Sequence, residues 1–259
     1  MQSLNFIESG PQDQTPIFFL PGGGVSAWSW KPVAGLLPDR RCIIVDLPET
    51  GGSLDCGPFS IAHAAAKVLE LADQINPGKP FHLVGLSLGG QVAAQILASA
   101  PQRVEKALLT GTLVRKLPGS GMAGCSGDLY MPFRNMPALV KANMQSLGIP
   151  MQYYGEFAED TMRLTAAGFR RVTVANMTFG LPAGLEKASL PVLVLVGEKE
   201  LGAMLDSARD LHQALPDSRA CRVSGEAHNW PLSNPALFAR VLTAFLDERP
   251  LPGELTAFL

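Results

Sequence analysis

Short apolar runs alternate with longer segments of helical pattern along most of this chain. The runs are continuous rather than alternating with polar residues, which suits strands buried on both faces of a parallel sheet. The predicted strands are residues 17–20, 42–45, 81–85, 106–110, 191–197 and, shorter, 219–223. The predicted helices are about 28–37, 60–75, 88–100, 204–215 and 234–247, with Ser60 and Ser233 as N-caps. This order predicts an α/β fold with a mostly parallel, doubly wound sheet.

The alternation stops between about residues 113 and 185, where no buried-strand run occurs. Helical patterns take its place near residues 132–147, 150–166 and 169–179. We therefore expect residues 1–112 and 186–259 to form the core and residues 113–185 to form a helical cap inserted in it.

Methionine and tyrosine are concentrated in the predicted cap. It holds seven of the nine methionines, which are Met122, Met131, Met136, Met144, Met151, Met162 and Met177. It also holds all three tyrosines, which are Tyr130, Tyr153 and Tyr154. A small satellite core would use such residues, but their clustering favours an adaptable apolar pocket wall, because methionine side chains repack easily. The candidate substrate-binding residues are Tyr130, Met131, Tyr153 and Tyr154.

Composition limits the classes of protein to consider. The chain has 259 residues, of which 47% are hydrophobic and 17% charged, so it can bury a sizeable core. Its net charge is −2 and it has no basic stripe, so no nucleic-acid partner is expected. The N-terminal residues lack the pattern of a signal peptide, and no apolar run is long enough for a membrane span.

The four cysteines, at positions 42, 56, 125 and 221, show no C-x-x-C spacing. We interpret them as isolated thiols in a reducing compartment and expect no metal site. We therefore expect a cytoplasmic protein. We also expect a monomer or a homodimer, and, from the Met- and Tyr-rich cap, a small apolar molecule as the substrate.

Residues 81–98 combine a strand, a turn and a helix, and the turn carries the decisive motif. Residues 85–89 read GLSLG, which matches the G-x-S-x-G nucleophile elbow. Ser87 has to occupy a sharp, strained turn so that its hydroxyl stands clear of the sheet. The glycines at both ends of the motif avoid a collision across the turn, and Gly90 lets the helix pack closely. Ser87 is the candidate nucleophile.

With this elbow the chain resembles the α/β-hydrolase superfamily, specifically its capped serine hydrolases of carboxylesterase type. The resemblance covers nearly the whole chain except the cap. It implies a cofactor-free enzyme in which the acid and the histidine follow the nucleophile in chain order.

Among the four histidines, His228 has the position that the resemblance requires. It lies in the loop between the last predicted core strand and the last predicted helix, where the family has its catalytic histidine. His63 begins a helix, His82 begins the strand that ends at Ser87, and His212 lies within a helix. We expect His228 to accept the proton of Ser87.

The acid of the triad is expected after the strand at 191–197. The family pattern there is G-x-x-D, and this chain has Gly197-Glu198-Lys199-Glu200. Glu200 takes the position of the acid, although glutamate replaces the usual aspartate, and Glu198 is the alternative. The expected role of Glu200 is to orient the imidazole of His228.

The resemblance also explains the glycine-rich segment after the first buried strand. The family has His-Gly-x-Gly there, whereas residues 21–24 are PGGG, with Pro21 in place of the histidine. The implied oxyanion hole consists of the backbone N–H groups of Gly23 and Leu88. A second family motif, G-x-G-x-S, is partly retained as ETGGS at residues 49–53.

The same glycines fit a dinucleotide-binding motif, which is an alternative interpretation. Gly22, Gly24 and Ala27 match G-x-G-x-x-G/A, and Asp46 follows about 20 residues later, where an acid would bind ribose. This interpretation leaves the elbow and the candidate acid and histidine unexplained, and it puts Pro21 against the first glycine. We expect a structural role for Asp46.

The sequence thus predicts a serine hydrolase that cleaves esters or thioesters with apolar groups through an acyl-enzyme. Ser87 excludes the aspartate nucleophile of dehalogenases and epoxide hydrolases. Three alternatives stay open. The triad could serve a C–C bond hydrolase, a perhydrolase or a lyase. The chain could be a slow or non-catalytic ligand receptor, or an NAD-dependent oxidoreductase.

Overall fold

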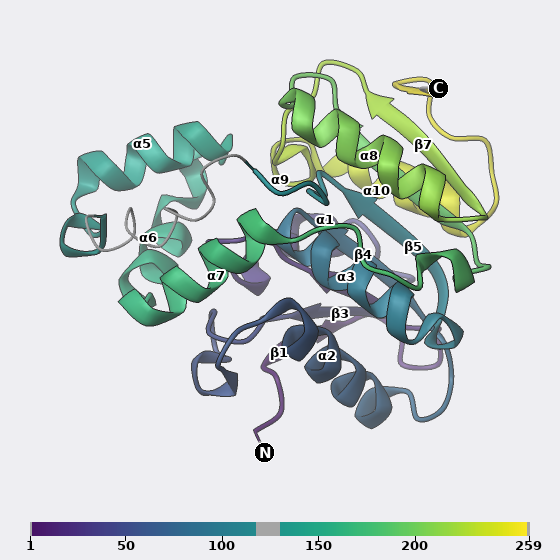
Figure 1. Ribbon diagram of the computed structural model, residues 1–259, viewed down its shortest axis with the longest axis horizontal. Coiled ribbons are helices and arrows are strands. Elements are labelled where there is room, and N and C mark those ends of the chain that lie inside the picture. The colour runs from purple at the N-terminus through teal and green to yellow at the C-terminus, as the bar shows by residue number, and fades with distance from the viewer. Residues whose placement is uncertain (1, 118–129, 258–259) are drawn as a thin grey trace.

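Eight strands of the described chain form one sheet in the order β1-β3-β2-β4-β5-β6-β7-β8. Figure 1 shows this sheet with helices packed against it. The structure is a computed structural model that describes residues 2–117 and 130–257. The strands are β1 (Phe6–Ser9), β2 (Ile17–Leu20), β3 (Cys42–Val45), β4 (Phe81–Leu86), β5 (Val104–Thr110), β6 (Val192–Gly197), β7 (Ser218–Val223) and β8 (Leu255–Ala257). Strands β2 to β7 run parallel, and β1 and β8 are antiparallel at the two edges. The predicted mostly parallel α/β sheet is confirmed.

Strands β2, β3, β4 and β6 are buried along their whole length, as their continuous apolar runs predicted. Phe18 and Leu20 of β2 pack in one apolar cluster, and Ile17 and Phe19 pack in the other. The first cluster lies under helices α2 (Ile61–Ile75), α3 (Leu88–Ser99) and α8 (Gly202–Ala214), and the second under α1 (Lys31–Ala34) and α10 (Pro235–Leu246). The edge strands β1 and β8 were not predicted, because they are short and partly exposed and carry no apolar run.

Two local predictions need correction, and one is confirmed. The helix predicted at 28–37 is a 3-10 helix at Ala27–Trp30 followed by the single turn of α1, because Gly35 ends that turn. Ser233 is not the N-cap of the last helix. Asn234 caps α10 by accepting a hydrogen bond from Leu237 N at 3.2 Å. Ser60 caps α2 as predicted.

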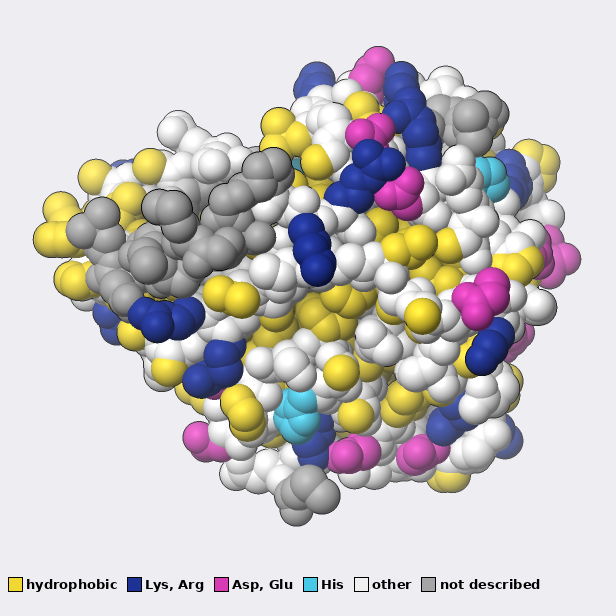
Figure 2. All heavy atoms as spheres, viewed as in Figure 1, with side chains coloured by type: hydrophobic (Ala, Val, Ile, Leu, Met, Phe, Trp, Pro, Cys, Tyr) yellow, Lys and Arg dark blue, Asp and Glu magenta, His cyan; other side chains and the backbone are white. Residues whose placement is uncertain are grey.

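Between β5 and β6 three α-helices of the described chain make a lobe beside the sheet (Figure 1). They are α5 (Pro137–Leu147), α6 (Tyr154–Arg163) and α7 (Ala166–Thr178). Apolar residues of this lobe, among them Met144 and Phe157, form a small core with Val25, Trp28 and Leu232. Figure 2 shows further hydrophobic side chains on the outer edge of the lobe. Its division from the core as a cap domain stays a prediction.

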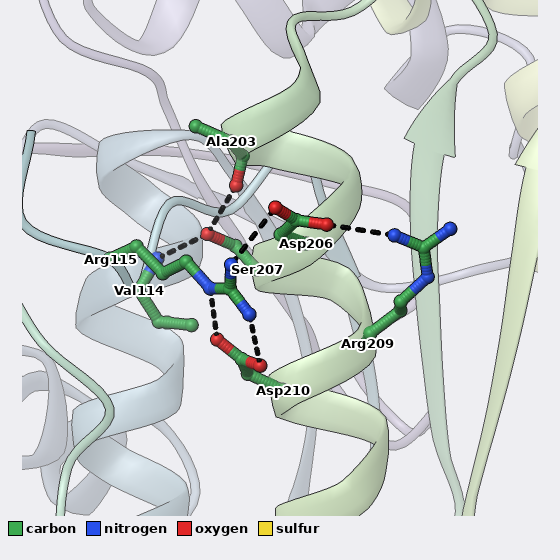
Figure 3. Close-up of polar contacts among 7 residues, drawn as sticks. All are labelled: Val114, Arg115, Ala203, Asp206, Ser207, Arg209 and Asp210. Atoms are coloured by element: carbon green, nitrogen blue, oxygen red, sulfur yellow. Dashed lines mark hydrogen bonds and ion pairs between the residues drawn. The ribbon is translucent and has the colours of Figure 1, made fainter.

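The start of this insertion is fastened to helix α8 (Figure 3). Arg115 donates two hydrogen bonds to Asp210, at 2.6 and 2.8 Å, and one to Asp206 at 2.9 Å. The backbone N–H of Val114 donates to the hydroxyl of Ser207 at 3.1 Å. The Arg115 guanidinium holds the pKa of Asp210 below its usual range. These contacts fix where the chain leaves β5 for the lobe.

Three of the four cysteines, Cys42, Cys56 and Cys221, are buried and free of disulfides. Burial raises the pKa of Cys42 to about 11, so its thiol is unreactive. Met122 and Cys125 lie outside the described residues. Of the helices in the described ranges, none has both the length and the apolar character that crossing a membrane requires.

Candidate active site

Ser87 occupies a strained turn between β4 and α3. Its φ is 54° and its ψ is −114°, a region that residues with a side chain rarely adopt. Its backbone N–H donates to Thr110 O at 2.9 Å, and its carbonyl accepts from Gln91 N at 3.0 Å. These bonds hold the turn in the geometry that the elbow motif predicted.

The glycines around Ser87 have no room for a side chain. A methyl carbon on Gly89 would lie 2.2 Å from the carbonyl oxygen of Leu20, and one on Gly85 would lie 2.5 Å from Gly89 O. A methyl carbon on Gly90 would lie 2.0 Å from Oγ1 of Thr112. Helix α3 therefore approaches the sheet as closely as the sequence motif implied.

We expect Gly89→Ala to destabilise the protein by about 3 kcal/mol, because the added carbon meets rigid backbone. That loss corresponds to a Tm lower by about 6–12 °C. Gly155→Ala in α6 is the matched control, since no atom lies within 4 Å of the carbon it adds. Thermal and urea unfolding measure both variants, and equal stability of Gly89→Ala and the wild type would contradict the prediction.

Glu200 and His228 form a hydrogen-bonded pair. Nδ1 of His228 lies 2.6 Å from Oε2 of Glu200, and Oε1 accepts from Gly197 N at 3.0 Å. The Glu200 side chain is 1% exposed. Glu198 is exposed and accepts a hydrogen bond from Gly225 N at 2.6 Å instead. Of the two candidate acids, Glu200 is the one that contacts the imidazole.

The end of β5 brings this pair to the same sheet edge as Ser87. Thr110 O accepts the backbone hydrogen bond of Ser87, and a methyl carbon on the next residue, Gly111, would lie 2.9 Å from Nδ1 of His228. The indole N–H of Trp230 donates to Oγ1 of Thr110 at 2.9 Å and anchors the histidine loop. Within the described residues no hydrogen bond joins Ser87 Oγ to His228. Such bonds are often long in ligand-free enzymes.

The glycine loop after β2 lies against the elbow. A methyl carbon on Gly22 would lie 3.6 Å from Cβ of Ser87, and one on Gly23 would lie 3.8 Å from Cβ of Leu88. Leu88 is the first residue of α3, so its N–H has no acceptor within the helix. Gly23 and Leu88, whose backbone N–H groups are predicted to form an oxyanion hole, therefore lie next to each other in space.

Asp46 is engaged in structural hydrogen bonds. Its carboxylate is buried and accepts from Ala27 N at 2.7 Å, from Asn5 Nδ2 at 2.7 Å and from Gly52 N at 2.8 Å. After Gly24 come only the 3-10 helix and the single turn of α1, too short for the helix N-terminus that binds a pyrophosphate. These features count against the dinucleotide interpretation.

A cavity of about 380 Å³ lies between the glycine loop and the lobe. Its size is in the range of small-molecule sites. The lining residues are Gly23, Gly24, Glu49, Thr50, Tyr130, Asn143, Ser146, Leu147, Phe157, Thr161, Leu164, Gly168, Phe169, Val172, Thr173, Asn176 and Met177. Among these described residues Glu49 is the only charged one. The cavity is thus largely apolar, with hydroxyl and amide groups interspersed.

The structure places one of the four candidate substrate-binding residues on this cavity. Tyr130 lines it, and its ring stacks on Phe169 at 5.3 Å. Met131 borders a separate groove instead. Tyr153 packs against Trp28, with ring centroids 5.6 Å apart, and Tyr154 lies under the ammonium of Lys141.

The methionines of the lobe have several different environments. Among the described ones, Met177 alone lines the cavity, and Met144 is fully buried in the small core of the lobe. Met136, Met151 and Met162 are 51%, 46% and 61% exposed. Among the described residues, the cavity wall is therefore built mainly by side chains other than methionine. The concentration of methionine in the lobe reflects its small core and its surface as well as the cavity.

The sequence analysis did not identify two polar residues, one connecting the lobe to the elbow helix and one connecting it to the histidine loop. Gln91 is fully buried in α3, and its Nε2 donates to Leu113 O and to Asn176 O, both at 2.9 Å. Asn229, next to the candidate histidine, donates to Leu147 O. A glutamine inside an otherwise apolar helix face was the one signal that could have identified Gln91.

The chain belongs to the alpha/beta hydrolase family, whose model matches residues 17–241. It is 27% identical to a pimeloyl-[acyl-carrier protein] methyl ester esterase of Serratia marcescens, over 91% of this chain and 95% of that protein. It is 25% identical to a Bacillus subtilis protein provisionally named 2-succinyl-6-hydroxy-2,4-cyclohexadiene-1-carboxylate synthase, over 92% and 93%.

The fold is also similar to solved structures. The enol-lactonase of Burkholderia xenovorans matches with a TM-score of 0.79 and 21% identity, over 94% of this chain and 96% of that chain. This likeness confirms the predicted α/β-hydrolase fold.

Proposed function

We propose that this protein is a serine hydrolase that cleaves esters or thioesters with apolar groups through an acyl-enzyme. The observation that carries the proposal is the strained Ser87 turn beside the hydrogen-bonded pair of His228 and Glu200. A serine with a positive φ and a ψ of −114° costs free energy, and such strain is concentrated at functional sites. The esterase relative supports the same reaction class.

In the proposed mechanism Ser87 Oγ attacks the acyl carbon while Nε2 of His228 takes its proton. Glu200 holds the imidazole with its proton on Nδ1 and stabilises the imidazolium that forms. The N–H groups of Gly23 and Leu88 donate to the oxyanion. His228 then protonates the leaving group, and water, activated by the same imidazole, cleaves the acyl-enzyme.

The proposed substrate carries an uncharged group into the cavity. The wall is mostly apolar, and the only charged lining residue among those described, Glu49, is paired with Arg171. An unpaired carboxylate or ammonium on the substrate would lose its hydration there without gaining a partner. Esters with neutral aliphatic or aromatic groups fit this environment.

The relative named a synthase supports a second candidate function. The same serine, histidine and acid would then serve a C–C bond hydrolase or lyase. A panel of esters, thioesters and C–C substrates separates these reactions, and labelling by a fluorophosphonate separates an enzyme from a non-catalytic receptor. Absence of labelling together with absence of turnover would reject the hydrolase proposal.

We expect kcat/KM to rise by at most about fourfold for each methylene added to the acyl chain, and then to stop rising at the cavity's limit. Phe169→Ala and Met177→Ala should move that limit to longer chains, because both residues line the cavity. Met162→Ala is the matched control, since this residue is 61% exposed. Acetate through decanoate esters provide the series. An unmoved limit in both lining variants would show that the cavity does not bind the acyl group.

A further inference from the structure

Glu49 has a backbone conformation that favours glycine. Its φ is 65°, in the left-handed region, and it occupies the first position of the ETGGS segment, where the corresponding motif has glycine. Glycine would adopt this conformation without strain. A glutamate in its place persists only where the surrounding structure holds the strained backbone, and the side chain of Glu49 makes several of the interactions there.

The Glu49 side chain connects the loop after β3 to helix α7. Nε of Arg171 donates to its Oε2 at 2.9 Å, and Nη2 of Arg171 donates to Oε1. Oε2 also accepts from the backbone N–H of Phe59 at 2.9 Å. The Arg171 guanidinium, above all, holds the pKa of Glu49 below its usual range. The carboxylate is therefore ionised and fully engaged near neutral pH.

This ion pair stands at the wall of the cavity. Glu49 and Gly168 both line it, and a methyl carbon on Gly168 would lie 3.6 Å from the Glu49 carboxylate. The first turns of α7 thus lie directly on the loop, and in Figure 1 α7 runs from the lobe toward the sheet. The Glu49 side chain is 11% exposed and that of Arg171 is 39% exposed, so one side of the pair faces solvent.

We propose that the Glu49–Arg171 ion pair closes this wall of the cavity and determines the size of the group that the protein accepts. The inference rests on the proposed hydrolase function for its assignment of the cavity to substrate. Of the other contacts between lobe and core, that of Trp28 Nε1 with Asp160 at 2.7 Å involves one charged group. The ion pairs of Arg115 with Asp206 and Asp210 lie at helix α8, among residues that do not line the cavity. Glu49–Arg171 is the bidentate ion pair at the cavity wall, and high ionic strength weakens it because Arg171 is partly exposed.

The test compares Glu49→Gln, Arg171→Met and the double variant with the wild type. Each single variant should raise the ratio of kcat/KM for branched, bulky esters to that for acetate esters by about fourfold or more, the effect of one further methylene of room. The double variant should show no larger change, because both substitutions break the same pair. Raising the salt concentration from about 0.05 M to about 1 M should shift the wild type in the same direction and the variants much less.

Glu254→Gln is the matched control, since Glu254 pairs with Arg240 at 2.6 Å on the exposed surface and does not line the cavity. Its ratio should equal that of the wild type. A ratio unchanged in both single variants, or effects that add in the double variant, would overturn the proposal.

A readout without hydrolysis separates this inference from the proposed function. Stopped-flow fluorescence of Nile red, a neutral apolar dye, should show faster association with Glu49→Gln than with the wild type. If the dye associates faster with Glu49→Gln but the wild type cleaves no ester, the hydrolase function is rejected and the proposal that the ion pair closes the cavity wall is supported. Ester turnover with equal dye association and an unchanged size ratio would reject the closed wall alone.

Discussion

Ser87→Ala should lower ester turnover by about 10⁴- to 10⁶-fold, because the substitution removes the nucleophile and with it the acyl-enzyme. Labelling by a fluorophosphonate should disappear as well. The fold should persist, since the backbone N–H and carbonyl of residue 87 make the hydrogen bonds that hold the turn. We expect a Tm change of less than about 2 °C.

Ser99→Ala is the matched control for the nucleophile. Ser99 ends the same helix that begins after Ser87, and its hydroxyl donates to backbone carbonyls of that helix. Turnover of p-nitrophenyl esters and labelling are measured for both variants. Ester turnover by Ser87→Ala at the rate of the control would exclude Ser87 as the nucleophile.

Glu200→Gln should lower kcat by about 10²- to 10⁴-fold through the tautomer of His228. Gly197 N donates to Oε1, so the amide of the variant keeps its oxygen there and directs its NH₂ group toward Nδ1 of His228. Nδ1 then has to accept a hydrogen bond, and the ring proton moves to Nε2. An imidazole protonated at Nε2 cannot take the proton of Ser87.

Glu198→Gln makes the same substitution at the glutamate two residues earlier and serves as the control. This side chain is exposed and contacts Gly225 N rather than the imidazole, so we expect at most a few-fold loss of kcat. Single-turnover kinetics of both variants with one activated ester measure the acylation step. A larger loss in Glu198→Gln than in Glu200→Gln would move the role of the acid to Glu198.

Much of the fold was predictable because it depends on local features. Strands β2 to β6 contain continuous apolar runs, since helices cover both faces of the sheet, and a short run of that kind is typical of a buried parallel strand. The elbow was predictable for a similar reason. Its five residues contain the whole constraint, namely a strained serine between two glycines that have no room for a side chain.

The edge strands could not be predicted in the same way. β1 and β8 pair antiparallel with neighbours distant in sequence, and each is partly exposed, so its pattern resembles that of a loop. The predicted N-cap of α10, Ser233, was one residue before the observed N-cap, Asn234. Ser233 and Asn234 both suit a cap, and only the path of α9 (Trp230–Ser233) determines which of them precedes the helix.

The sequence by itself determined the class of fold and the elbow, because strands, helices and the turn are patterns within a few neighbouring positions. The order of the three candidate catalytic residues came from the resemblance to the α/β-hydrolase superfamily that the elbow indicated. The tertiary structure decided which glutamate contacts His228 and which residues of the lobe line the cavity. It also revealed the pairing of Glu49 with Arg171 across 122 positions of the chain. Such contacts depend on how the helices pack on the sheet. The sequence separation of two residues does not indicate how far apart packing places their side chains.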